Sequence, residues 1–154
     1  MTDSPVRIRP IESRDRDDWV RLFTAYGVFY ETSFTPRVLD GVWQWLMDAE
    51  HEVSALVAEP DGPIGQYLVG FAHLRRLNDT FTAGPSWFLD DLYVVPERRG
   101  AGIARALIEA CEATAHAAGG GTLRWITASD NTTAQRLYDR VATRATWVTY
   151  EKET

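Results

Sequence analysis

The chain has very little cysteine and lysine. Cys111 is its only cysteine and Lys152 its only lysine, so an internal disulfide is excluded and no lysine nucleophile is available in the body of the fold. The lack of lysine also argues against a Walker-type phosphate loop, which needs one beside its glycines. Cys111 lies in an alanine-rich segment, where the usual role of cysteine is that of a small buried side chain.

Long apolar runs and an excess of positive charge are also absent. No run of about eighteen apolar residues occurs, and the first residues lack the pattern of a secretion signal, so we expect a cytoplasmic protein without membrane contact. The net charge of −6 disfavours nucleic-acid binding and favours cationic partners. His51, His73 and His116 lack metal-ligand spacing, so no metal is expected; His73, on a predicted strand, is a candidate proton relay.

The order of apolar patterns indicates the fold class. With 154 residues, 45% of them hydrophobic, the chain fits a single domain over residues 1–154. The patterns predict strands over residues 6–11, 52–59, 67–75, 87–95, 122–127 and 146–151, and helices after Ser13, after Thr35, over 102–118 and from Asn131. A helix connects strands 87–95 and 122–127, so these two should be parallel. We therefore expect an α/β fold with a mixed sheet and about four helices.

The most informative segment is the turn after residues 91–95. An apolar strand runs into a basic turn and then an alanine-rich helix. Gly100 and Gly102 have no Cβ, so phosphate oxygens can approach the amide groups that the first helical turn leaves unpaired. Arg98, Arg99 and Arg105 add positive potential. An ordinary strand-to-helix turn is the alternative, with glycines that serve only its geometry.

The spacing of the residues in this turn distinguishes between the possible phosphate-containing ligands. A dinucleotide fingerprint requires a small residue three positions after the second glycine, where this chain has Arg105. A Rossmann site is therefore disfavoured. A pyrophosphate bound outside a Rossmann frame indicates coenzyme A.

Two motifs make the chain resemble a known family. The run 99–104 matches the Arg/Gln-x-x-Gly-x-Gly/Ala signature of the GNAT superfamily of N-acetyltransferases, and Asn131, Ala134 and Tyr138 match its second motif. The resemblance covers nearly the whole chain and is closest to the diamine, histone-type and amino-acid N-acetyltransferases. It implies the acyl-CoA N-acyltransferase fold, in which a mostly antiparallel sheet has one parallel pair that splays apart at the coenzyme. It also implies acetyl-CoA as the acetyl donor, with no metal.

The resemblance implies the coenzyme-binding residues as well. The backbone of Leu92, Tyr93 and Val94 would pair with the pantetheine arm, as an added strand does. Asn131 and Ala134 would line the far side of the coenzyme. The pyrophosphate would be held by the turn and the first helical residues, namely Arg99, Gly100, Ala101, Gly102, Ile103, Ala104 and Arg105.

The implied chemistry needs an acid and a base. The amine must lose a proton before it attacks the thioester, and the departing thiolate must gain one. Tyr138 would supply that proton, and Asp90 would take the amine's proton through water, with Asp91 as the second candidate. Two alternatives stay open, because Tyr138 also fits a packed helix stripe and Asn131 also fits a helix cap.

The substrate is indicated less sharply. Tyr30 and Glu31 align with a pair that holds the polycation in diamine acetyltransferases, and with Asp90 they favour a primary amine of a small cationic molecule, such as a polyamine or amino acid. The segment 140–147 is shorter than in the diamine enzymes and lacks their glutamate pair. A protein lysine or N-terminal acetyltransferase and a non-catalytic coenzyme A sensor are the alternatives. We also expect a homodimer through residues 147–150, because the family often pairs its C-terminal strands.

Overall fold

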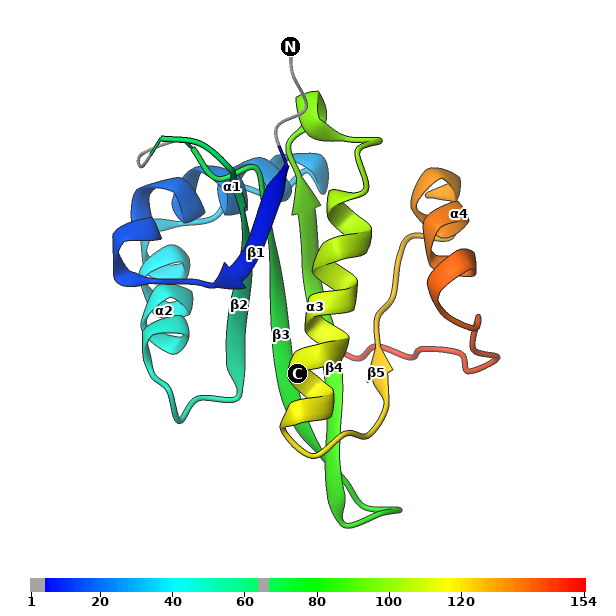
Figure 1. The fold of residues 1–154 in the computed structure, drawn as a ribbon. Coiled ribbons are helices and arrows are strands. Elements are labelled where there is room, and N and C mark those ends of the chain that lie inside the picture. Colours follow the sequence, from blue (N-terminus) through cyan, green and yellow to red (C-terminus); the bar gives the residue numbers. More distant parts are fainter. Residues whose placement is uncertain (1–4, 64–66) are drawn as a thin grey trace.

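The computed structural model describes residues 5–63 and 67–154, which form a mixed sheet with helices on both faces (Figure 1). The strands follow the order β1-β2-β3-β4-β5. The pairs β1–β2, β2–β3 and β3–β4 are antiparallel, and the pair β4–β5 is parallel. The strands are β1 (Val6–Pro10), β2 (Val53–Pro60), β3 (Gly70–Asp79), β4 (Gly84–Val94) and β5 (Leu123–Arg124). The helices are α1 (Arg16–Phe29), α2 (Pro36–Met47), α3 (Ile103–Ala117) and α4 (Thr132–Val141), with short 3-10 turns η1 (Ser13–Asp15) and η2 (Pro96–Arg98). The expected mixed α/β sheet is confirmed.

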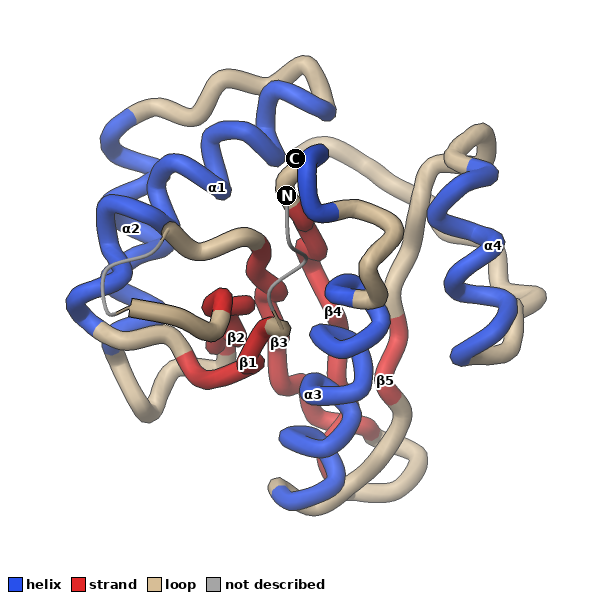
Figure 2. Tube along the Cα trace, turned by 45° about the horizontal axis from the view of Figure 1, so that its top comes forward, coloured by secondary structure: helices blue, strands red, loops and turns tan. Residues whose placement is uncertain are grey.

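The helices divide between the two faces of the sheet (Figure 2). On the face covered by α1 and α2, Trp19, Leu22 and Phe23 are buried against Val57 and Phe71. The residues of α1 recur at the three-to-four spacing that keeps one helix face apolar. On the other face, α3 buries its own apolar stripe, made of Ile103, Leu107, Ile108, Cys111 and Ala115.

Cys111 has the structural role that its sequence context indicates. Its side chain is fully buried in α3, and burial raises the pKa of the thiol to about 12. Since the thiolate is the reactive form, this cysteine is not a nucleophile at neutral pH.

A bulge interrupts the long β3–β4 pair. His73 lies opposite Asp91, and the next residue, Leu74, lies opposite Leu89, so Asp90 is an extra residue on β4. A bulge of this kind bends the strand and re-aims its side chains. Nothing in the alternation of residues along β4 indicated it.

The β4–β5 pair is short and open. In the described part of the chain it consists of Trp87↔Leu123 and Phe88↔Arg124, after which the strands diverge. The glycine run before β5 permits the close approach at its start, because a Cβ on Gly121 would lie 2.1 Å from the carbonyl oxygen of Pro85. The expected splayed parallel pair is thus present, although β5 is shorter than the predicted strand 122–127.

The prediction of a last strand over residues 146–151 is wrong. Residues 143–154 have no regular secondary structure, and Trp147, Val148 and Tyr150 are 82%, 75% and 91% exposed. A strand needs a partner for its backbone groups, and this tail has no neighbouring strand within the structure described.

Candidate functional site

A small pocket of about 30 Å³ lies where β4 and β5 separate. It is walled by α1, β4, the segment after β5, and α4, so residues far apart in sequence meet there. The lining residues are Tyr26, Tyr30, Leu89, Asp90, Leu92, Trp125, Ile126, Thr127 and Tyr138. The structure thus brings together Tyr30, Asp90, Leu92 and Tyr138, which the sequence predicted from separate motifs.

The end of β4 has one paired edge and one that faces the gap. Toward β3, Leu92, Tyr93 and Val94 lie opposite Ala72, Phe71 and Gly70. Toward β5, pairing ends at Phe88, as described above. A strand edge in this state can accept an extended ligand by backbone hydrogen bonds, as the sequence predicted for Leu92, Tyr93 and Val94.

The glycine turn beyond β4 has the geometry of an anion site. Gly100 and Gly102 adopt φ of +80° and +81°, a conformation that favours glycine, and a Cβ on either would meet no heavy atom within 4 Å. The bond from the Ala106 N–H to the Gly102 carbonyl, 3.0 Å long, is the first turn of α3. The amides of Ile103, Ala104 and Arg105 precede this bond, so the helix itself does not use them.

Two of the predicted arginines, Arg99 and Arg105, make contacts at or near the turn. The Arg99 Nε donates to the Val94 carbonyl at 3.0 Å, and its guanidinium lies 5.6 Å from the Tyr93 ring centre. Arg105 pairs with Glu109 at 2.8 Å one helical turn later. Both guanidinium groups place positive charge near the turn, and Arg99 also ties the turn to the end of β4.

Tyr138 lies both in the core packing and at the pocket. It packs on the core from α4, with its ring 5.5 Å from that of Trp125 in an edge-on arrangement, and it also lines the pocket. Burial, and secondarily the neighbouring Tyr30, raises the pKa of Tyr138. The phenol therefore keeps its proton at neutral pH, as a proton donor must.

Asn131 caps α4. Its side-chain oxygen accepts the Ala134 N–H at 3.3 Å, so the N-cap alternative holds in the structure. A capping box between Thr132 and Gln135 is not formed, because the Gln135 amide donates instead to the carbonyls of Ala128 and Ser129. The cap fixes the start of the helix that carries Tyr138.

The two adjacent aspartates have different partners. The Asp90 carboxylate holds Arg75 by two bonds of 2.8 and 2.9 Å, and the Asp91 carboxylate contacts His73 Nδ1 at 2.8 Å. The bond to Asp90 is the main cause that raises the pKa of Arg75. The sequence gave no signal for Arg75, since this pair depends on the register of β3 and β4.

Of the predicted pair Tyr30 and Glu31, only Tyr30 lies at the pocket. Tyr30 lines the pocket, whereas Glu31 is exposed at the end of α1 with φ of +55° and is not among the lining residues. Tyr26, which no sequence motif indicated as a site residue, takes a wall position one helical turn before Tyr30. The i, i+4 spacing of the two tyrosines is the signal that could have found it.

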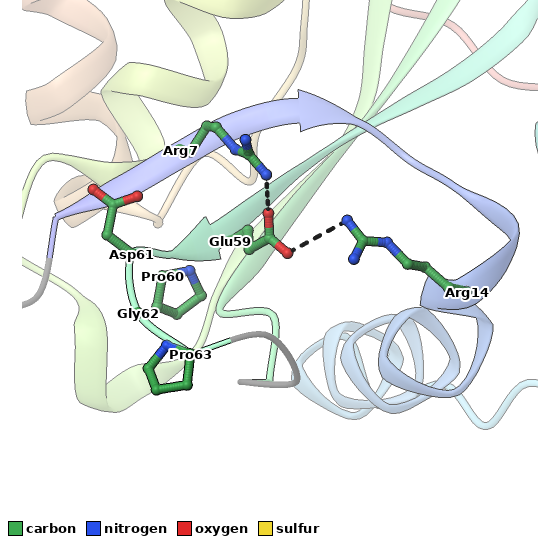
Figure 3. Close-up of a pocket in the computed structure, with 7 residues that line it drawn as sticks. All are labelled: Arg7, Arg14, Glu59, Pro60, Asp61, Gly62 and Pro63. Carbon is green, nitrogen blue, oxygen red and sulfur yellow. Dashed lines mark hydrogen bonds and ion pairs between the residues drawn. The ribbon is translucent and has the colours of Figure 1, made fainter.

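A larger hollow, about 350 Å³, lies elsewhere, at the ends of β1 and β2. Figure 3 shows Glu59 between Arg7 and Arg14 on its wall. Glu59 also accepts from Arg9 at 2.9 Å, and these contacts, with Arg9 first, lower the pKa of Glu59 to about 2. The charges of this hollow neutralise one another, so its size alone does not make it a reaction site.

Residues 5–63 and 67–154 contain no group of three or more potential metal ligands. In the same ranges, no helix has both the length and the apolar character needed to cross a membrane.

Comparisons with known proteins agree with this geometry. The chain is 28% identical over 152 residues to the D-amino-acid N-acetyltransferase HPA3 of Saccharomyces cerevisiae, covering 99% of this chain and 93% of the yeast protein. A ribosomal-protein-alanine N-acetyltransferase from Brucella melitensis biovar Abortus 2308 has a TM-score of 0.76 and 26% identity, over 97% of this chain and 100% of that one. The aminoglycoside N-acetyltransferase AAC(6')-Iy, solved with CoA, has the same fold, with a TM-score of 0.82 and 19% identity over 97% and 95% of the two chains.

The family model decides the assignment. The model of the acetyltransferase (GNAT) family matches residues 17–142, which include the glycine turn, the β4–β5 gap and α4. This chain belongs to the acetyltransferase (GNAT) family of N-acetyltransferases, a family that uses acetyl-CoA.

Proposed function

We propose that the protein transfers an acetyl group from acetyl-CoA directly to a primary amine of a small cationic molecule, such as an amino acid or a polyamine. The observation that carries this proposal is the pocket at the β4–β5 split, which both Asp90 and Tyr138 line. Transfer without an acyl-enzyme is favoured because the one cysteine is buried and protonated.

The described residues fit the coenzyme. The open space over Gly100 and Gly102, together with the amides at the start of α3, suits a pyrophosphate. The edge of β4 that faces the gap at residues 92–94, where Arg99 already binds the Val94 carbonyl, suits the amide-bearing arm. Ala101 lies between the two glycines, and Asn131 and Ala134 at the start of α4 would border the other side. Coenzyme A bound there would supply the thioester.

Tyr138 and Asp90 would have separate roles in the reaction. Tyr138, held as a neutral phenol, would donate its proton to the departing sulfur. Asp90 lies on the same wall, where its carboxylate oxygens could accept a hydrogen bond from an ammonium group. Arg75 already holds this carboxylate with two bonds, which offsets its charge and disfavours Asp90 as the group that removes the proton of the substrate.

The substrate class rests on charge and size. The net charge of −6 and the carboxylates of β4 suit a cation. The names of the relatives above give a D-amino acid, an aminoglycoside and a ribosomal-protein alanine as acceptors, and these three classes define the panel for testing. The narrow pocket, enclosed by three tyrosines, favours a small acceptor over a folded protein.

The C-terminal tail supports a homodimer. Trp147, Val148 and Tyr150 expose apolar side chains on an extended segment with no strand beside it in the structure described. Pairing of this tail with a second copy would satisfy its backbone and cover these side chains. Sedimentation of the full chain and of a Trp147→Ser, Tyr150→Ser variant tests this; a wild-type monomer would contradict it.

A thiol-release screen tests the proposed activity. Acetyl-CoA is offered with amino acids of both configurations, polyamines, aminoglycosides and basic peptides, and free coenzyme A and acetylated product are measured. We expect turnover with a small cationic amine. Turnover confined to peptides would support the protein acetyltransferase, and tight coenzyme binding without turnover of any amine would support the sensor.

A further inference from the structure

Four aromatic side chains line the pocket at the β4–β5 split, and we call them the aromatic wall. Tyr26 lies in the last turn of α1 and Tyr30 is the C-cap of that helix. Trp125 follows β5, and Tyr138 lies on α4. All four line one hollow of about 30 Å³, which has room for a group about the size of a water molecule. A small group bound there therefore lies against rings from both sides of the pocket.

The rings of the aromatic wall form two pairs that are not stacked. The rings of Tyr26 and Tyr30 have centres 5.0 Å apart and planes at 59°. Those of Trp125 and Tyr138 have centres 5.5 Å apart and planes at 73°. Parallel stacking would cover one face of each ring, whereas at these angles the two rings of a pair leave faces that the partner does not cover.

The wall is rigid on its inner side and accessible on its outer side. Phe23 stacks on Tyr26 with ring centres 6.1 Å apart, and Phe71 meets Tyr26 edge-on at 6.0 Å. Both phenylalanines are buried, so the core holds the inner ring in place. Tyr30 is 46% exposed at the end of α1. A ligand can thus enter past Tyr30 and meet a ring whose position is already fixed.

The formal charge at the pocket is largely offset. Asp90 is the acidic residue among the lining residues, and none of them is basic. Arg75 holds the Asp90 carboxylate with bonds of 2.8 and 2.9 Å. Burial is the main cause that raises the pKa of Tyr26 and of Tyr138, so neither phenol is a phenolate at neutral pH. A preference of this pocket for cations must therefore come mainly from groups without formal charge.

Aromatic rings are groups of this kind. The face of a ring carries partial negative charge, and it attracts an ammonium ion that lies within about 6 Å of the ring centre, most strongly when the ring is that of Trp or Tyr. A neutral group of the same shape gains no such attraction. An aromatic wall therefore distinguishes an ammonium group from a hydroxyl group in the same position.

We propose that the aromatic wall binds the ammonium group of the acceptor through cation–π contacts, and that Tyr30 and Trp125 determine the specificity for alkylammonium groups. The contact uses the rings, so the hydroxyl of Tyr138 stays available as the proton donor proposed above. The wall acts on binding, and the amine still has to lose a proton before it attacks. This inference rests on the proposed function, since it places the acceptor amine in this pocket.

Two probes of matched shape test the aromatic wall without turnover. n-Butylammonium and 1-butanol differ mainly in charge, and each is titrated by NMR into the protein saturated with coenzyme A, which has no acetyl group to transfer. We expect the wild type to bind n-butylammonium at least about tenfold more tightly than 1-butanol. Equal affinity for the two probes would overturn the proposal.

Variants of Tyr30 separate the ring from its hydroxyl group. Tyr30→Phe keeps the ring and should keep the affinity for n-butylammonium within about twofold, whereas Tyr30→Leu should weaken it about fivefold and leave 1-butanol binding nearly unchanged. Trp45→Leu is the matched control, because Trp45 is a half-exposed ring on α2 that is not among the lining residues. Equal losses in Tyr30→Phe and Tyr30→Leu would assign the effect to the hydroxyl group and overturn the proposal.

A double variant tests the contribution of formal charge. Asp90→Asn combined with Arg75→Gln removes both charges of the ion pair together, so no unpaired charge is left beside the pocket. We expect the preference for n-butylammonium to stay within about threefold of the wild-type value, and Trp125→Leu to reduce it about fivefold. A preference that is lost in the double variant and kept in both Tyr30→Leu and Trp125→Leu would overturn the proposal. The Tyr30 variants decide the matter if Trp125→Leu does not fold.

The thiol-release screen keeps this inference separate from the proposed function. For an amine that is acetylated, Tyr30→Leu should raise KM about fivefold and leave kcat within about twofold. A wild type that prefers n-butylammonium and acetylates no amine supports the aromatic wall and overturns the proposed function. A wild type that acetylates amines and binds both probes equally overturns the aromatic wall and leaves the proposed function in place.

Discussion

The two edges of β4 differ in what they do. Toward β3 the strand is paired from Gly84 to Val94, and toward β5 it is paired at Trp87 and Phe88. The first edge fixes the position of the strand, and the second leaves its carboxyl-terminal half facing a gap. One strand can therefore be rigidly held and still present backbone and side chains to ligands, because the two edges are independent.

A similar contrast separates the two hollows. The larger one is lined by arginines and Glu59 whose charges are paired with each other. The smaller one gathers tyrosines and Asp90 around a split in the sheet. Polar groups that line the gap, rather than volume, distinguish the smaller hollow from the larger one.

The ion pairs of the closed region should matter for stability. Arg9 and Asp15 are joined by two bonds of 2.7 and 2.9 Å, and their side chains are 9% and 6% exposed. Arg9→Ala would leave a buried carboxylate unpaired, so we expect a loss of about 3–5 kcal/mol in the free energy of unfolding, measured with urea. The control is Arg144→Ala, at an exposed pair, with a change below about 1 kcal/mol. Similar losses in both variants would contradict the distinction.

The open region should matter for turnover. Tyr138→Phe removes the proposed proton donor and keeps the ring that packs on Trp125. We expect kcat to fall about 10²-fold, roughly 3 kcal/mol in the barrier, with acetyl-CoA affinity unchanged. Unchanged turnover would leave Tyr138 only its packing role.

Alanine substitutions at Gly102 and Gly41 should have opposite effects on stability, because the two backbones differ. Gly102 has φ of +81° and Gly41 lies inside α2, and an added Cβ meets nothing within 4 Å at either place. Gly102→Ala should cost about 1–2 kcal/mol of stability and raise the KM for acetyl-CoA. Gly41→Ala should instead stabilise by about 0.5–1 kcal/mol, since alanine favours helices. Equal shifts in melting temperature would contradict the backbone argument.

The smallest effect at neutral pH concerns acid sensitivity. The pKa of Glu59 is lowered from 4.5 to about 2 in the folded chain, mainly by Arg9, so the unfolded state binds the proton first. The contribution of Glu59 is complete above about pH 4.5 and is lost as the pH falls toward about 2. Glu59→Gln should flatten the loss of stability over this window in urea titrations at several pH values. A slope identical to that of the wild type would contradict it.

Local features of the site could be predicted from the sequence, and non-local ones could not. Gly100 and Gly102 reveal the turn because their freedom from a Cβ is a property of the residues themselves. The bulge at Asp90, the Arg75 pair and the wall position of Tyr26 depend on register and on a helix packed from elsewhere in the chain. The predicted strand 146–151 was wrong for a related reason, because its apolar pattern is real and a partner strand within the structure described is lacking.

Hydrogen exchange with and without acetyl-CoA tests the central claim most directly. If the open edge and the glycine turn hold the coenzyme, the amides of residues 92–94 and 100–105 should gain protection on binding, while those around Glu59 should not. Protection confined to the Glu59 hollow, or none at a coenzyme concentration that saturates turnover, would contradict the account.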